Sequence, residues 1–150
     1  MNVFEINWLA VLAATFAAFI IGAIWFGPKT FYPIWMKFQG RPIPTERVEM
    51  SAAETGTMFG GTFVGAFIQV TTLAIFINLA HSIDANFGPA QGALAGSLLG
   101  FGIAAAASFS HRMFGQSNYK VFDAVKVWLL EVSQDITSLT VAGLILASWL

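Results

Sequence analysis

Charged side chains are scarce in this sequence. Lys, Arg, Asp and Glu together make up 10% of its 150 residues, whereas 57% of the residues are hydrophobic. A soluble domain normally carries about 25% charged residues, because it needs them to cover its surface. Lipid must therefore replace the missing polar surface, and the composition predicts one integral membrane domain over residues 1–150.

Cysteine is absent, and this excludes disulfide frameworks, thiol nucleophiles, thiolate metal sites and covalently attached haem. The formal net charge of −1 argues against nucleic acid as a partner, because such binders cluster Lys and Arg on one face. The sequence contains no catalytic triad, phosphate loop or dinucleotide fingerprint, so we expect neither an enzyme nor a cofactor. His81 follows the second long apolar run and His111 follows the third, which places them on opposite sides of the membrane. They cannot share one metal ion, so we expect no metal site.

Long apolar runs are what the sequence does contain. A bilayer core needs roughly 20 consecutive apolar residues for each helix that crosses it. The runs predict helices at about 6–26, 57–80, 89–110 and 121–149. The first run follows Glu5 rather than a basic segment, so we interpret it as a retained helix and not as a signal peptide. The predicted fold class is all-α, a four-helix transmembrane bundle.

The connection 27–56 is the longest polar stretch, and it contains several prolines and charged residues. Its first part, from Phe31 to Phe38, interleaves aromatic side chains with Lys37. This composition suits a short segment in the headgroup layer, where Trp and Tyr are enriched. An ordered loop is an equally good interpretation of the same residues.

Basic residues predict the orientation of the helices, because cytoplasmic loops retain Lys and Arg. All of them fall between the first and second predicted helices or at the connection from the third into the fourth: Lys29, Lys37, Arg41, Arg47, Arg112, Lys120 and Lys126. The N-terminus, the turn 81–88 and the C-terminus have none. We therefore expect 27–56 to be a cytoplasmic loop and both termini to be non-cytoplasmic.

Glycines recur at intervals of about four residues in the second and third predicted helices. The glycines concerned are Gly56, Gly60, Gly61 and Gly65, followed by Gly88, Gly92, Gly96 and Gly100. Small residues at this spacing allow helix backbones to approach closely in a membrane. They predict a tight contact between the second and third helices or between protomers, with a glycine-lined permeation path as the alternative.

Acidic residues inside the fourth predicted helix are the best candidates for a functional site. Glu131, Gln134, Asp135 and Ser138 fall on one helix face. An acid at the centre of a membrane helix costs about 2.5 to 3.5 kcal/mol on insertion scales. We therefore expect a partner, water or protonation to compensate it, and we treat the acids as a candidate polar site.

Thr62, Gln69 and Thr72 share one face of the second predicted helix and could supply hydrogen bonds to these acids. The two sets together would line a narrow polar path. A structural interpretation is also open, in which Glu131 lies near the cytoplasmic interface and pairs with Arg112 or His111. Asp135, one turn deeper, is harder to explain in that way.

A family resemblance is visible at both ends of the chain. The segment Ala23-Ile24-Trp25-Phe26-Gly27-Pro28, followed by Phe31, Trp35-Met36-Lys37 and Gly40, resembles the opening of the DUF1761 family of bacterial membrane proteins. The segment Lys126-Val127-Trp128-Leu129-Leu130, with Trp149, is similar to the closing part of that family. The resemblance implies a multi-pass protein of the bacterial inner membrane with four helices, and it implies no activity.

Two functions fit these observations. One is a small oligomeric transporter or channel in which Asp135 and Glu131 bind or relay a proton or cation. The other is an accessory or structural subunit that packs against a larger membrane protein complex through its glycine faces and aromatic loop. The expected partners are the lipid bilayer and either further copies of the chain or another membrane protein. The sequence leaves both functions open.

Overall fold

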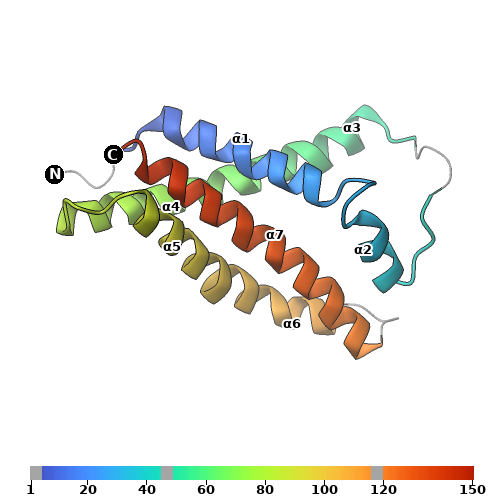
Figure 1. The fold of residues 1–150 in the computed structure, drawn as a ribbon. Helices are drawn as coiled ribbons and strands as arrows, with labels where there is room; N and C mark the ends of the chain where they lie inside the picture. The colour runs from blue at the N-terminus through green and yellow to red at the C-terminus, as the bar shows by residue number, and fades with distance from the viewer. Residues whose placement is uncertain (1–4, 45–48, 116–119) are drawn as a thin grey trace.

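The computed structural model describes residues 5–44, 49–115 and 120–150, and these residues form helices and no strand. The elements are α1 (Trp8–Trp25), α2 (Tyr32–Phe38), α3 (Ala52–Thr55), η1 (Gly56–Gly60), α4 (Gly61–Ile83), α5 (Pro89–Leu99), η2 (Gly100–Ala105), α6 (Ala106–Phe114) and α7 (Val121–Ala147). The elements η1 and η2 are π-helical turns. Because α3 runs through η1 into α4, and α5 through η2 into α6, the described residues form five continuous helical segments (Figure 1).

Four of these segments are long and apolar enough to cross a membrane: Trp8–Trp25, Ala52–Ile83, Pro89–Phe114 and Val121–Ala147. The fifth is α2, so the predicted number of four helices is corrected to five. The sequence left α2 open as an interfacial segment or an ordered loop. Pro33 occupies its first turn, where proline is compatible with a helix because the missing N–H would be unpaired there.

The second long helix begins earlier than the predicted residue 57. The hydroxyl of Ser51 accepts a hydrogen bond from the backbone N–H of Glu54 at 3.2 Å, and the Glu54 carboxylate accepts one from the Ser51 N–H at 2.8 Å. This reciprocal capping box satisfies backbone donors at the helix start. The predicted polar connection 27–56 therefore ends at Ser51, and the helix gains α3 and η1 before its apolar run.

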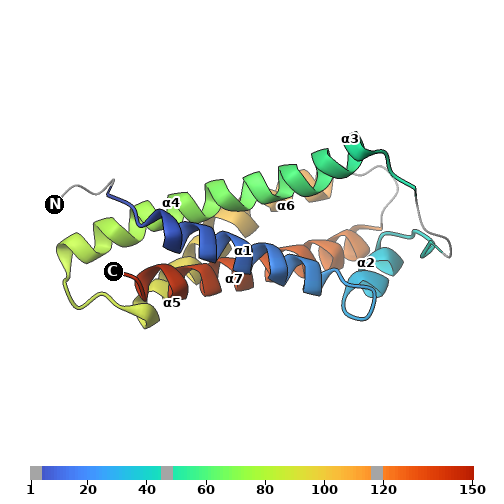
Figure 2. The same cartoon turned by 90° about the horizontal axis from the view of Figure 1, so that it is seen from above.

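Helix α7 lies at the centre of the molecule, between α1 on one side and α5 with α6 on the other (Figures 1 and 2). The core lies toward the end of the molecule that carries the end of α7. Its largest fully buried side chains are Val11 of α1, and Val70, Leu73 and Ile77 of α4. Leu139, Ala142 and Leu146 of α7 complete this cluster.

Glycines bring α5 and α7 into direct backbone contact. A Cβ atom added at Gly96 would overlap the carbonyl oxygen of Leu139, and one added at Gly143 would overlap that of Gly92. At Gly100 it would lie 3.0 Å from the Cα of Ile136. The predicted close contact through Gly92, Gly96 and Gly100 therefore exists, but the partner is the fourth long helix and not the second.

The other predicted packing glycines do not form such a contact within the described chain. Gly61 and Gly65 have no heavy atom within 4 Å of an added Cβ, and Gly88 precedes α5 in extended backbone. The reason is the path of the helix: α3 and the first half of α4 diverge from α6 and the start of α7 (Figure 1). All residues from Ala52 to Thr62 are exposed.

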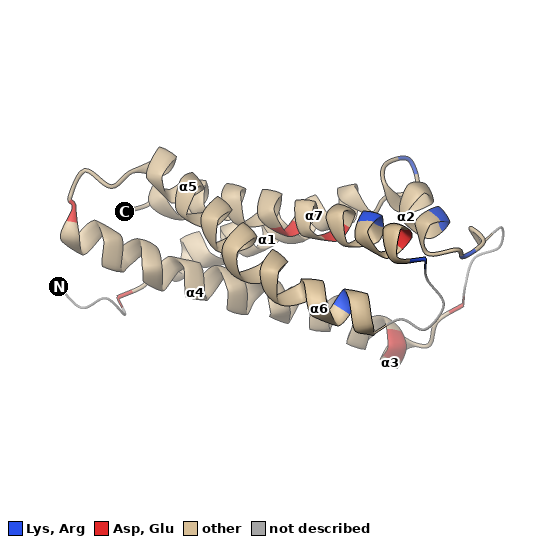
Figure 3. Cartoon of the chain, turned by 90° about the horizontal axis from the view of Figure 1, so that it is seen from below, with Lys and Arg blue, Asp and Glu red and all other residues tan. Residues whose placement is uncertain are grey.

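Charge is distributed unevenly between the two ends of the molecule. Every Lys and Arg that the structure describes lies at the end where α2 is found (Figure 3). The opposite end carries acidic residues, Glu5 shortly before α1 and Asp84 directly after α4. The start of α1, the end of α7 and the turn between α4 and α5 share that opposite end (Figure 1). Arg47 lies outside the described residues. The start of α1 and the end of α7 therefore lie at the end of the molecule where the structure describes no Lys or Arg.

Candidate functional site

Glu131 projects from α7 and forms an ion pair with Arg112 of α6. The Nε of Arg112 donates to Oε2 of Glu131 at 2.9 Å, and its Nη2 donates to Oε1 of the same carboxylate. The two side chains are only 19% and 24% exposed. A bidentate guanidinium–carboxylate pair compensates both charges in one geometry. The structure thus forms the pairing that the sequence offered as one of two interpretations of Glu131.

Helix α2 contributes the third member of this cluster. The indole Nε1 of Trp35 donates to Oε1 of Glu131 at 3.0 Å. Trp35 also stacks edge-to-face on Phe26, with ring centroids 5.5 Å apart, and the ammonium group of Lys126 lies 5.0 Å from the ring centroid of Phe38. These contacts hold the short helix against α7, so that Glu131 joins α2, α6 and α7.

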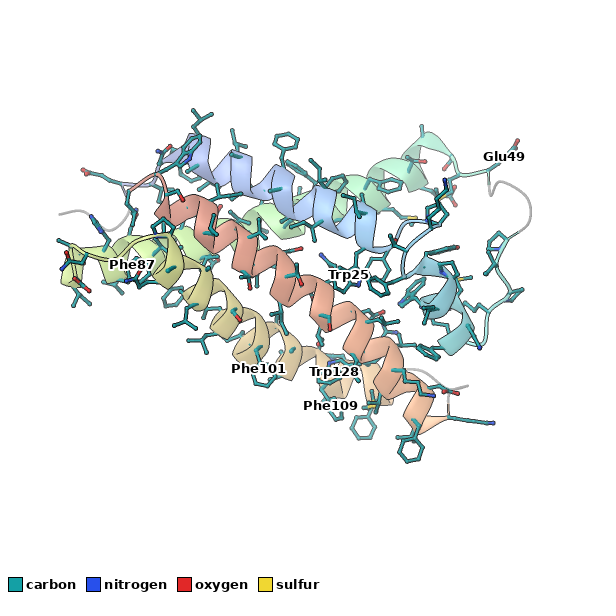
Figure 4. The ribbon with its side chains drawn as sticks, in the orientation of Figure 1. Trp25, Glu49, Phe87, Phe101, Phe109 and Trp128 are labelled. Atoms are coloured by element: carbon teal, nitrogen blue, oxygen red, sulfur yellow. The ribbon has the colours of Figure 1, made fainter. Side chains whose placement is uncertain are left out.

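Two further tryptophans fix the neighbours of this part of α7. The Nε1 of Trp25, at the end of α1, donates to the backbone carbonyl of Leu130 at 3.1 Å. The Nε1 of Trp128 donates to the carbonyl of Ala105 and to the hydroxyl of Ser108, both at 3.2 Å. Figure 4 shows Trp25 between α1 and α7, and Trp128 beside Phe109 on α6. Indole N–H groups need such partners away from water.

The contact of Trp128 depends on the local geometry of the third long helix. Ala105 is the last residue of the π-helical turn η2. A π-bulge shifts the regular backbone hydrogen bonds by one residue, and such bulges occur often at functional sites. Here the Ala105 carbonyl accepts the Trp128 indole as well as the hydroxyl of Ser108, at 3.0 Å.

Asp135 lies one turn further along α7 than Glu131, about 6 Å deeper by helical rise. It is partly buried. Among the residues that the structure describes, its carboxyl group forms no hydrogen bond and no ion pair with another side chain. Two acids on one face of one helix therefore have opposite surroundings: Glu131 is fully engaged and Asp135 is not.

Gln134 and Ser138 are occupied with each other. The Gln134 Nε2 donates to the Ser138 hydroxyl at 2.8 Å, and Ser138 is buried. The Gln134 amide packs on α1 at Gly22, where an added Cβ would lie 3.4 Å from Nε2. These two predicted site residues thus serve the contact between α1 and α7, beside the acids.

The predicted facing set from α4 is not at this site. Thr62, Gln69 and Thr72 are exposed. The hydroxyls of Thr62 and Thr72 donate to carbonyls of their own helix, those of Met58 at 2.6 Å and Ile68 at 2.9 Å. The polar path predicted between these residues and the acids is therefore corrected. The buried face of α4 is formed by apolar residues, and its polar face points outward.

Two other features lie away from the acids. A small pocket at the end with the chain termini is lined in part by Asn7, Asn78 and Trp149. His81 is in the last turn of α4 and His111 is in α6, at the other end of the molecule. Over the described ranges, no three His, Asp or Glu side chains gather in a geometry that would hold a metal ion.

Sequence reasoning did not assign the three indoles to the site. The sequence assigns no hydrogen-bonding role to Trp25, Trp35 or Trp128, yet each donates a hydrogen bond that ties another element to α7 or α7 to α6. A tryptophan in or next to an apolar helix carries one donor that needs an acceptor. This requirement indicates from the sequence that each indole hydrogen-bonds within the fold, although it does not identify the acceptor.

Comparison with known proteins identifies a family. No curated protein and no solved structure matches the chain. A family model described as "Protein of unknown function (DUF1761)" matches residues 9–147, which is nearly the whole chain and runs from the second residue of α1 to the end of α7. The chain belongs to the DUF1761 family of proteins of unknown function.

Proposed function

We propose that this chain is a multi-pass protein of the bacterial inner membrane that conducts or transports a proton or small cation, with Asp135 as the group that binds it. Four helices with the length and composition of membrane spans support the location. The positive charge at a single end of the molecule supports an orientation with that end in the cytoplasm.

The observation that carries the proposal is the contrast between Asp135 and Glu131. An acid kept for structural reasons inside a membrane helix needs compensation, and Glu131 has it from Arg112 and Trp35. Asp135 has no such partner among the described residues, although it lies deeper in the same span. A proton or cation that binds and leaves would supply the missing compensation, which is the usual role of intramembrane acids.

The neighbouring ion pair would support this role. Arg112 holds a fixed positive charge next to Glu131, so the paired carboxylate does not compete for the same cation. The Trp35 indole donates a further hydrogen bond to the same carboxylate, and the Trp25 indole donates to the neighbouring backbone carbonyl of Leu130. Glu131 is therefore paired within the fold, whereas Asp135 has no such partner among the described residues.

A flux measurement tests the proposal. The protein is reconstituted in liposomes, and proton, Na⁺ and K⁺ movement is followed with entrapped indicator dyes under an imposed gradient. We expect flux in the wild-type protein and its loss in Asp135→Asn. The matched control is Asp123→Asn on the same helix, whose carboxylate pairs with Lys126 at 2.9 Å in an exposed position.

Each outcome bears on the role of Asp135. Flux should persist in Asp123→Asn, and both variants should elute from a sizing column as the wild type does. Unchanged flux in a folded Asp135→Asn would contradict the proposal, as would the absence of wild-type flux of all three ions.

A further inference from the structure

Gln69 lies near the middle of the helical segment Ala52–Ile83, which is long and apolar enough to cross a membrane. Its side chain is exposed, and within the described part of the chain its amide forms no hydrogen bond. In hydrocarbon an amide without a partner is costly, because lipid chains offer neither donor nor acceptor. The group therefore requires a polar partner at the same depth, from outside the described residues.

The surroundings of Gln69 on α4 permit a very close approach. Gly65 and Gly61 precede it by one and two turns, and Thr72 follows it by one turn, so that they lie on the same side of the helix. No heavy atom lies within 4 Å of a Cβ added at either glycine. At Gly96 and Gly143, by contrast, backbone atoms of the facing helix occupy the space that a Cβ would take. Glycines thus form backbone contacts inside the fold, whereas Gly61 and Gly65 remain open to a further helix.

The chemistry of this face suits a second copy of itself. The segment from Gly56 to Leu79 contains no Lys, Arg, Asp or Glu, so two identical faces do not repel each other. A primary amide carries both donors and an acceptor, so it is complementary to an identical amide. Copies inserted in the same orientation place Gln69 at equal depth, and a two-fold axis along the membrane normal brings the two amides together.

We propose that the α4 face formed by Gly61, Thr62, Gly65, Gln69 and Thr72 binds the same face of a second copy. Glycines at the crossing allow the helices to approach, and the paired Gln69 amides hydrogen-bond across the interface. This dimer is independent of the role of Asp135, which projects from α7. A negative flux result for Asp135 would not affect the dimer, and the absence of a dimer would not affect the proposed role of Asp135.

Cross-linking in native membranes gives the first test, and the absence of cysteine makes single-cysteine variants unambiguous. We expect Thr62→Cys and Thr72→Cys to form disulfide-linked dimers on mild oxidation. The matched control is Val64→Cys: Val64 is 55% exposed but points about 140° away from Gln69 around the helix. It should remain monomeric on gels. Equal cross-linking of the control, or none in the threonine variants, would overturn the proposal.

Native mass spectrometry in nanodiscs gives the second test. The wild-type protein should appear as a dimer, Gln69→Asn should keep it, and Gln69→Leu should weaken dimerisation about tenfold because the interfacial hydrogen bonds are lost. A dimer of unchanged strength in Gln69→Leu would contradict the pairing of the amides. A monomeric wild type, or cross-linking of the threonine variants to a different protein, would refute a second copy as the occupant.

Discussion

Glu131 and Asp135 are one turn apart on α7, and the difference between them is a difference in partners. Glu131 receives two hydrogen bonds from Arg112 and one from Trp35. Asp135 receives none from the described side chains. One acid thus ties three helices together, and the other is the group to which we assign an exchangeable proton or cation.

Removal of Arg112 should destabilise the protein through the carboxylate that remains. For Arg112→Gln we expect a loss of about 2 kcal/mol, because a partly buried Glu131 loses its charged hydrogen bonds. The double variant Arg112→Gln with Glu131→Gln should recover part of this loss, since no unpaired charge is left behind. Unfolding of the purified variants in detergent measures both values. Additive losses in the double variant would show that the two side chains are not coupled.

The sequence predicts which residues belong to this region but not which residues of other helices they contact. Helical spacing places Glu131, Gln134, Asp135 and Ser138 on one face, and the structure agrees. The partner of Glu131 comes from another helix, and spacing within one helix says nothing about it. For the same reason, the face of α4 with Thr62 and Gln69 was assigned to the acids although it points outward.

At the scale of elements, the contact between α5 and α7 leaves no room for a side chain at its glycines. A Cβ at Gly96 would overlap backbone atoms of Leu139 and Thr140, which cannot rotate away. We expect Gly96→Ala to cost about 1 to 3 kcal/mol of stability, as overpacking does in a filled core. Gly102→Ala is the control, because an added Cβ there meets no atom within 4 Å. Equal thermal midpoints for the two variants would show that the two helices are further apart.

The attachment of α2 should depend on the Trp35 indole. Trp35→Phe keeps an aromatic ring but removes the donor to Glu131. We expect α2 to detach more often, so that trypsin cleaves after the exposed Lys37 several times faster in detergent-solubilised protein. Trp149→Phe is the control, since that residue is at the other end of the molecule. Unchanged cleavage would mean that the aromatic contacts alone hold α2.

The elements themselves were largely predictable. Apolar runs of sufficient length located all four long helices, because hydropathy reports directly on burial in lipid. The choice of neighbours was not predictable in the same way. Glycines spaced four apart indicate that another backbone comes close, but they do not identify the partner helix. The glycines of α5 contact α7 rather than α4.

At the scale of the whole molecule, the basic end and the end with the termini define an orientation that is testable in cells. We expect Ala85→Cys, in the turn between α4 and α5, to react with a membrane-impermeant maleimide added outside spheroplasts. Glu49→Cys, in the polar connection before α3, should react only after the membrane is opened. Both residues are exposed, so accessibility within the fold is equal. The reverse pattern would invert the orientation.

Asp135 is the proposed proton- or cation-binding acid, and Glu131 is paired with Arg112. Carbodiimide labelling tests this directly, because dicyclohexylcarbodiimide enters bilayers and modifies protonated carboxyl groups there. Mass spectrometry of peptides from labelled membranes locates the adduct, and Asp135→Asn is the control. We predict an adduct on Asp135 that decreases as the pH is raised, and none on Glu131, whose carboxyl group is paired with Arg112. An adduct on Glu131, or none on Asp135 at any pH, would contradict the proposed role of Asp135.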